Sequence, residues 1–215
     1  MTRRLVPPIA TGLVVIAAVA VFGLVVARST AWTAGDLSIL RSLSAAHNPV
    51  LDAIAVGIDW LFAPPRAIGI TVVVAVALLA VRRDVRMTIG FVLLVAISWL
   101  GSDLVKAIVH RPRPDSTQLL NPLIVTPGSY SYPSGHVAFA ASLGLALVVI
   151  AARGRWRNAA IGLAVVMALA TAWSRAYLGV HYVTDVVAAL VYTAAAVALL
   201  AALSRRFVAH RPART

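Results

Sequence analysis

Three cationic side chains stand at junctions between apolar stretches of the sequence, where an anion could bind. They are Lys106, Arg113 and Arg175, and Lys106 is the only lysine in the chain. A guanidinium can hold two phosphate oxygens at once, whereas an ammonium acts as a point charge. A lysine buried at the end of an apolar helix also needs a counter-anion, which a phosphate would supply. Together the three cations predict a binding site for a phosphate group.

The turn Pro133–His136 offers further groups of this kind. Ser134 carries a hydroxyl donor and can cap the helix that is expected to follow it. Gly135 would lie at the N-terminus of this helix, where free backbone N–H groups and the helix dipole favour an anion. His136 is free to donate a proton to a leaving oxygen. Alone the turn would only reverse the chain, so its interpretation depends on its coincidence with the cations.

His181 and Asp185 have the spacing of a catalytic pair. Residues four apart share one face of a helix, provided that the helix has begun by His181. Asp185 could then fix the imidazole tautomer and stabilise positive charge on the ring, which suits a nucleophile or a base. Phosphoryl transfer mainly needs positioning and compensation of negative charge, so the three cations could replace the usual Mg²⁺. Since Asp185 is the only acid in these motifs, no metal site is expected.

The composition shows which elements must position these groups. Of 215 residues, 61% are hydrophobic and only 12% are charged, which is about half the charged fraction of a soluble domain. The apolar residues form runs of sixteen to twenty-two. A helix of this length is near what is needed to cross a hydrocarbon core about 30 Å thick. We therefore expect an all-α, integral membrane six-helix bundle that forms a single domain over residues 1–215.

Six spans are predicted from the apolar runs. Their boundaries are 6–27, 67–81, 87–109, 136–152, 158–173 and 184–203. The alternative for the first span is a cleaved signal peptide, but the apolar core of such a peptide is usually shorter, about 7–15 residues. Residues 28–66 are mixed in polarity, and we expect one or two short interfacial helices there on the outer surface. An interfacial anchor is preferred over a lid for this segment.

The distribution of charge predicts the orientation of the bundle. Twelve of the 19 basic residues fall near the termini and in every second connection, as the positive-inside rule requires of cytoplasmic loops. We therefore expect a multi-pass protein of the cell membrane with both termini in the cytoplasm and the three motifs at the outer face. This topology and attraction to anionic membrane lipids explain the net charge of +12, so no nucleic-acid partner is expected.

The three motifs resemble the signature of the type 2 phosphatidic acid phosphatase superfamily, which also contains the vanadium haloperoxidases. The signature reads K-x6-R-P, then P-S-G-H, then S-R-x5-H-x3-D. It is matched in order by Lys106 with Arg113-Pro114, by Pro133–His136, and by Ser174-Arg175 with His181 and Asp185. The resemblance covers roughly residues 67–203. The haloperoxidases are soluble, so the resemblance points to the membrane members.

The resemblance implies a lipid phosphatase that needs neither metal nor cofactor. His181 would be the nucleophile that forms a phosphohistidine, Asp185 would orient it, and His136 would protonate the leaving group. The phosphoryl oxygens would be held by Lys106, Arg113, Ser134, the Gly135 amide and Arg175. His110 and Arg111 do not belong to the signature and are left unassigned.

Three functions stay open at this point. The preferred one is hydrolysis of a lipid phosphate in a bacterial cell envelope, the candidates being undecaprenyl diphosphate, phosphatidic acid and phosphatidylglycerol phosphate. A phosphotransferase that passes the phosphoryl group to another lipid would use the same nucleophile. A non-enzymatic anion or lipid transporter is disfavoured by the His181–Asp185 pair, because anion binding needs only the cations. The sequence predicts neither the particular lipid nor the oligomeric state.

Overall fold

Helices are the regular secondary structure of the residues that the computed structural model describes, which are 6–126, 128–150, 154 and 156–209. These residues form eight α-helices and one 3₁₀ helix at Ser116–Gln118, and no strand. The α-helices are α1 (Val6–Arg28), α2 (Thr30–Ala45), α3 (Pro49–Phe62), α4 (Pro64–Arg82), α5 (Val85–Val109), α6 (Gly135–Ile150), α7 (Trp156–Tyr177) and α8 (Val183–Ala209).

Within the described residues, five helices are long and apolar enough to cross a membrane: α1, α4, α5, α7 and α8. The fourth predicted span, 136–152, corresponds to the shorter apolar helix α6, and its last two residues lie outside the described part. At 1.5 Å per residue, α6 is about 24 Å long, less than a hydrocarbon core of about 30 Å. The protein is therefore an all-helical, multi-pass membrane protein, whereas the count of six crossings stays a prediction.

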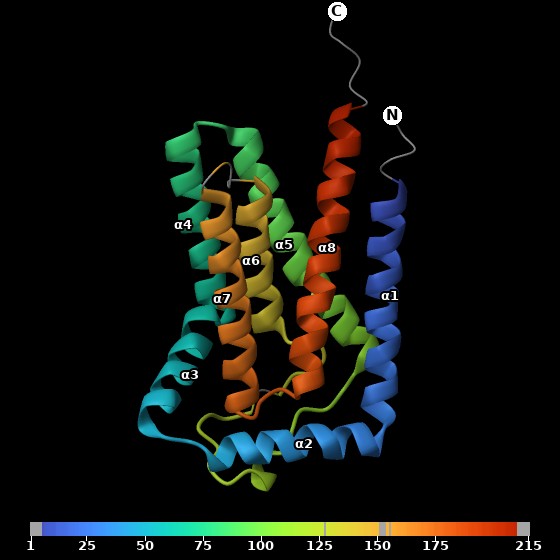
Figure 1. Cartoon of the computed structure of the whole chain (residues 1–215), viewed down its shortest axis with the longest axis vertical. Coiled ribbons are helices and arrows are strands. Elements are labelled where there is room, and N and C mark those ends of the chain that lie inside the picture. Colours follow the sequence, from blue (N-terminus) through green and yellow to red (C-terminus); the bar gives the residue numbers. More distant parts are fainter. Residues whose placement is uncertain (1–5, 127, 151–153, 155, 210–215) are drawn as a thin grey trace, which may run out of the picture.

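The helices between the first two spans lie at one end of the bundle. In Figure 1, α2 runs across this end, and α3 slants from it towards the start of α4. Ser29 caps α2 by accepting a hydrogen bond from the Trp32 N–H, and Asn48 caps α3 by accepting one from the Leu51 N–H. Residues 28–66 thus contain two helices, as expected, while their interfacial position stays a prediction.

The ends of the chain are placed consistently with the predicted topology. Helix α1 begins and α8 ends at the end of the bundle opposite α2 (Figure 1). The connection between α4 and α5, which carries three of the predicted cytoplasmic arginines, lies at that end too. The predicted basic residues Arg3, Arg4, Arg153, Arg155, Arg211 and Arg214 lie outside the described residues. Which side of the membrane this end faces stays a prediction.

Helix α6 is the buried centre of the bundle. Every residue from Val137 to Gly144 is buried, as expected of a helix that is apolar all round. Gly144 lies against α7, where an added Cβ would come within 2.7 Å of the Ala164 Cβ. This close approach fixes α6 against α7, and it thereby holds the Pro-Ser-Gly-His turn at the start of α6.

Two helix boundaries near the motifs differ from the predicted ones. Helix α7 continues to Tyr177 instead of ending at 173, so Arg175 lies in its last turn. Helix α8 begins at Val183, one residue before the predicted start at 184, so the condition that the helix has begun by His181 is not met. The cause is a Schellman motif, in which the Gly179 N–H bonds to the Ala176 carbonyl and the Val180 N–H to the Arg175 carbonyl.

The start of α4 and the end of α8 also differ from the predicted boundaries. Helix α4 begins at Pro64 instead of 67, because proline fits the first turn of a helix, where its missing N–H is no loss. Helix α8 continues to Ala209, six residues beyond the predicted end at 203. Neither change alters the order of the elements.

The packing of α6 against α7 predicts that Gly144→Ala destabilises the protein. The added methyl group would overlap Ala164, and overpacking of this kind typically costs about 1–3 kcal/mol. The control is Gly162→Ala on α7, where an added Cβ meets nothing within 4 Å. Thermal unfolding in detergent should show a lower Tm for Gly144→Ala only. Equal Tm values for the two variants would contradict this view of the contact.

Candidate active site

The three motifs converge at the end of the bundle where α2 lies. Gly135 joins the first motif to the second, because an added Cβ there would lie 3.7 Å from the Lys106 Nζ. Arg113 joins the first motif to the third, with its Nη1 2.9 Å from the His181 Nε2. The Ser134 N–H donates to the Asp185 carbonyl at 3.3 Å, which joins the second motif to the third. All eight site residues predicted from the sequence belong to this assembly.

His181 and Asp185 meet although α8 begins after His181. The imidazole Nδ1 lies 3.6 Å from the Asp185 Oδ2, and both side chains are buried. This distance is too long for a hydrogen bond, and the contact becomes an ion pair only when the ring is positively charged. The Asp185 Oδ2 also accepts a hydrogen bond from the Tyr182 N–H at 2.9 Å, as the acid of a capping box does at the start of a helix. The cap therefore orients the carboxylate towards the ring.

Arg113 defines the tautomer of His181. A guanidinium has no acceptor, so the close Nε2 must be the unprotonated nitrogen and the ring proton is on Nδ1, facing Asp185. Arg113 is itself fixed by donating from Nη1 to the Val180 carbonyl at 2.8 Å and from Nε to the Ser129 carbonyl at 2.8 Å. The lone pair of Nε2 thus points to the place where the cations gather.

The surroundings keep the His181 ring neutral. Burial lowers the pKa of His181 well below its ordinary value, and the positive charges of Arg113, Arg175 and Lys106 lower it further. Burial also lowers the pKa of Arg113 to about 10, although the charge of Asp185 acts in the opposite direction. At neutral pH the site therefore combines an uncharged imidazole with charged arginines.

Arg175 and His136 share an acidic partner that the motifs do not contain. The Asp59 Oδ1 of α3 pairs with the Arg175 Nη1 and lies 3.4 Å from the His136 Nε2. Helix α3 is held against α7 beside this contact, because the Ser174 hydroxyl donates to the Ala55 carbonyl at 2.7 Å. A single carboxylate oxygen thus lies between the two residues predicted to bind and protonate the substrate.

Lys106 and Ser134 differ from their expected surroundings. The Lys106 Nζ lies 3.4 Å from the Asp103 Oδ1, one turn earlier in α5, so the expectation that it lacks a counter-charge is wrong. The Ser134 hydroxyl, within the described structure, has no hydrogen-bond partner. The predicted side-chain cap of α6 is therefore not formed, and it is the Ser134 carbonyl that accepts the Ala138 N–H. A buried hydroxyl of this kind is available to a ligand.

Three further residues belong to the site and were not predicted from the sequence. They are Asp59 in α3 and Arg111 after α5, which contact motif residues directly, and Asp36 in α2, which is linked to them through Arg111. A signal existed for the acids, because a carboxylate in an apolar helix is costly to bury without a partner. Asp52 and Asp59 are also seven residues apart, which places both on the face of α3 that contacts α7.

Acidic and histidine side chains are too dispersed here to form an obvious metal centre. Over the described residues, no group of three His, Cys, Asp or Glu side chains could hold a metal ion. The positive charges predicted to bind phosphate are those of Lys106, Arg113 and Arg175, and Arg111 lies behind them against Asp185.

The comparison with protein families identifies the fold. The sequence profile of the PAP2 superfamily matches residues 87–209, which is more than half of the chain and includes all three motifs. The chain belongs to the PAP2 superfamily. The profile begins in α5, so Asp36 and Asp59 lie outside the part that matches the PAP2 superfamily, whereas Arg111 lies within it.

Two known proteins are similar to this PAP2 chain. An undecaprenyl-diphosphatase of Sulfolobus acidocaldarius is 29% identical over 119 residues, which are 54% of each chain. This chain therefore spans about half the length of the curated relative that it matches. The crystal structure of a transmembrane PAP2-type phosphatidylglycerolphosphate phosphatase from Bacillus subtilis superposes with a TM-score of 0.70. The superposition covers 98% of both chains at 24% identity, so the fold is shared over nearly the whole length.

Proposed function

We propose that this PAP2 protein is an integral membrane phosphatase that hydrolyses a lipid phosphate through a phosphohistidine, without a metal. The observation that carries the proposal is the contact between the His181 Nε2 and Arg113, at 2.9 Å. It gives a neutral nucleophile whose lone pair faces a cluster of cations. Phosphoryl transfer depends mainly on such positioning and charge compensation.

The site residues divide the reaction between them. The His181 Nε2 attacks phosphorus, while Lys106, Arg113, Arg175, the Ser134 hydroxyl and the Gly135 amide bind the phosphoryl oxygens. Asp185 stabilises the positive charge that forms on the ring. His136 protonates the leaving oxygen and then takes a proton from the water that cleaves the N–P bond. The products are the lipid with its leaving oxygen protonated and inorganic phosphate, and His181 is regenerated.

Asp59 occupies part of the anion site before substrate binds. Its oxygen contacts Arg175 and lies 3.4 Å from the His136 Nε2, where a phosphoryl or leaving oxygen would need to be. The Asp59 carboxylate and a substrate phosphate would repel each other strongly if both contacted Arg175 in this buried site. We therefore propose that the substrate phosphate displaces Asp59 from Arg175.

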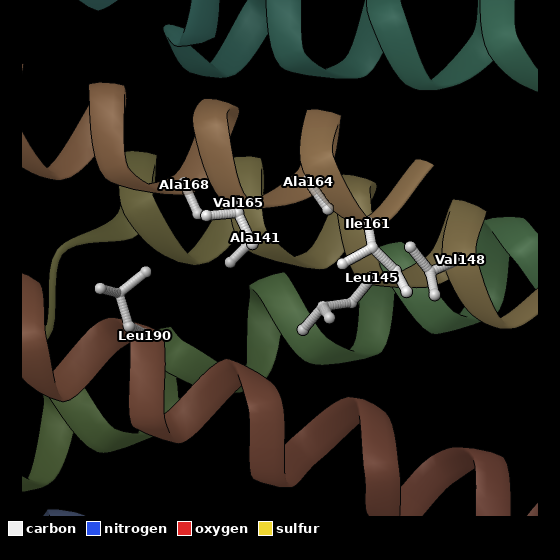
Figure 2. A pocket seen from close by; sticks show the side chains of 8 residues that line it. All are labelled: Ala141, Leu145, Val148, Ile161, Ala164, Val165, Ala168 and Leu190. Carbon is white, nitrogen blue, oxygen red and sulfur yellow. The ribbon is translucent and has the colours of Figure 1, made fainter. Parts of the chain in front are cut away.

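An apolar cavity beside the site supports a lipid substrate. It has a volume of about 150 Å³ and lies between α6, α7 and α8, the helices that carry four of the eight site residues (Figure 2). Its lining residues Ala141, Ala168 and Leu190 lie five to seven residues from site residues on the same helices, or about 7–11 Å along each axis. An acyl or prenyl chain could lie there with its phosphate at His181.

The substrate candidates are undecaprenyl diphosphate, phosphatidic acid and phosphatidylglycerol phosphate. The names of the two similar proteins each contain a lipid phosphate from this group. With the basic connections in the cytoplasm, the site would open at the outer face of the cell membrane.

The proposed function predicts phosphate release that survives EDTA. Protein purified in detergent should release phosphate from at least one of the three lipids with the chelator present, because the cations act in place of a metal. Loss of activity that Mg²⁺ restores would refute the metal-free mechanism. Transfer of labelled phosphate to another lipid, with none to water, would replace the hydrolase by a transferase.

His181→Asn should reduce kcat by about a hundredfold or more, because the substitution removes the nitrogen that is proposed to attack phosphorus. The control is His110→Asn, which changes an exposed histidine with a left-handed backbone that asparagine tolerates. Reactions with labelled lipid that are quenched in alkali, where the N–P bond is stable, should yield a phosphohistidine in the control and none in His181→Asn. A variant at His181 that keeps its phosphoenzyme would assign the nucleophile elsewhere.

Asp59→Asn should strengthen inhibition by inorganic phosphate, because the substitution removes the charge that competes for Arg175. We expect the inhibition constant to fall about tenfold, equivalent to about 1.4 kcal/mol. The control is Asp52→Asn, since Asp52 accepts a hydrogen bond from the Tyr177 hydroxyl at 2.7 Å and does not contact Arg175. An inhibition constant that stays the same or rises in Asp59→Asn would rule out competition.

A further inference from the structure

Arg111 links two buried carboxylates, one of which belongs to the catalytic pair. Its Nη1 donates to the Asp185 Oδ1 at 2.7 Å, and its Nη2 donates to the Asp36 Oδ2 at 3.0 Å. Arg111 is 1% exposed, Asp36 5% and Asp185 0%. Buried charges persist only when they are paired, so the three side chains form one unit.

Arg111 is held in place from several sides. Its Nη1 also donates to the Thr184 hydroxyl at 2.5 Å, and its guanidinium stacks 4.0 Å from the centre of the Tyr182 ring. Its backbone carbonyl accepts the Ser131 N–H at 2.9 Å. A planar guanidinium fixed in this way can set the direction of a carboxylate, which a lysine ammonium cannot do equally well.

Asp36 connects α2 to the start of α8. Its Oδ1 accepts the Thr184 N–H at 3.2 Å, and its Oδ2 accepts the Thr184 hydroxyl at 2.5 Å. The carboxylate thus satisfies a free N–H in the first turn of α8, as a cap does, but from a helix 148 residues away. Leu40, one turn later in α2, is fully buried in a cluster with Leu119 and Tyr182, which fixes α2 there.

The unit determines how Asp185 faces His181. Arg111 holds the Asp185 Oδ1, and the Tyr182 N–H holds Oδ2, the oxygen nearest the ring. The carboxylate therefore cannot rotate away from His181. Because Asp36 shares the guanidinium, the unit keeps a net negative charge, which favours the positive charge on a phosphorylated ring.

We propose that Arg111 and Asp36 are positioning residues for the His181–Asp185 pair, and that α2 thereby contributes Asp36 to the active site. The inference rests on the proposed phosphohistidine mechanism. Neither residue contacts the cations that bind phosphate, so both act on the chemical step and leave binding unchanged.

The test uses Asp36→Asn and Arg111→Lys in the full-length protein. Each variant keeps much of the size of the side chain but breaks the shared charge pairing. We expect kcat for phosphate release to fall about tenfold or more, with KM for the lipid and the inhibition constant of inorganic phosphate within about threefold of wild type. The control is Arg41→Gln, because Arg41 ties the exposed face of α2 to Gln118 without contacting Asp185.

The outcomes separate this inference from the proposed function. An active wild type whose kcat is unchanged in both variants would overturn the inference alone. Parallel loss of kcat and of phosphate inhibition would also overturn it, because the whole site would then have been disrupted. A wild type that releases phosphate from none of the three lipids would overturn the proposed function and the inference with it. Tm values measured alongside show that the compared proteins are folded.

Discussion

A charge placed away from water is costly unless an opposite charge or several hydrogen bonds accompany it. This constraint explains the polar end of the bundle, where the buried arginines have partners from distant parts of the chain. Arg111 is paired with Asp36 and Asp185, and Arg175 is paired with Asp59. The acids of α2 and α3 are thus what allows the cations to be buried at all. The tight placement of both helices follows from this pairing.

The apolar part of the bundle holds the helices that carry the polar residues in place. Helix α6 is buried over most of its length and packs closely on α7 at Gly144. The end of α7 and the start of α6 therefore form a rigid base. On this base, His136 and Arg175 face the same carboxylate. A rigid base suits phosphoryl transfer, which gains from preorganised charges more than from mobility.

The sequence was sufficient to predict the helical membrane class and the eight residues that the structure brings together. These residues lie in short motifs whose spacing is fixed within single segments. Asp36, Asp59 and Arg111 were not predicted, because their partners lie 74 to 148 residues away and no local pattern specifies such contacts. The shared helical face considered for His181 and Asp185 is not formed for a different reason, since the Schellman motif at Gly179 ends α7 and leaves His181 in the turn before α8.

Gly179 also sets how much change the connection between α7 and α8 can absorb. It has a φ of +67°, and any Cβ there would come within 2.1 Å of Leu119 in the long polar loop. His181, the proposed nucleophile, follows two residues later, so its position depends directly on the conformation of this tight turn. Surface loops usually tolerate insertions, and the exposed stretch around Leu120 and Val125 fits that pattern. Residues 178–182 do not fit it, because one added residue would rotate His181 away from both Arg113 and Asp185. An inserted residue is therefore expected to be tolerated around Leu120 and Val125 and to disrupt the site when it falls within residues 178–182.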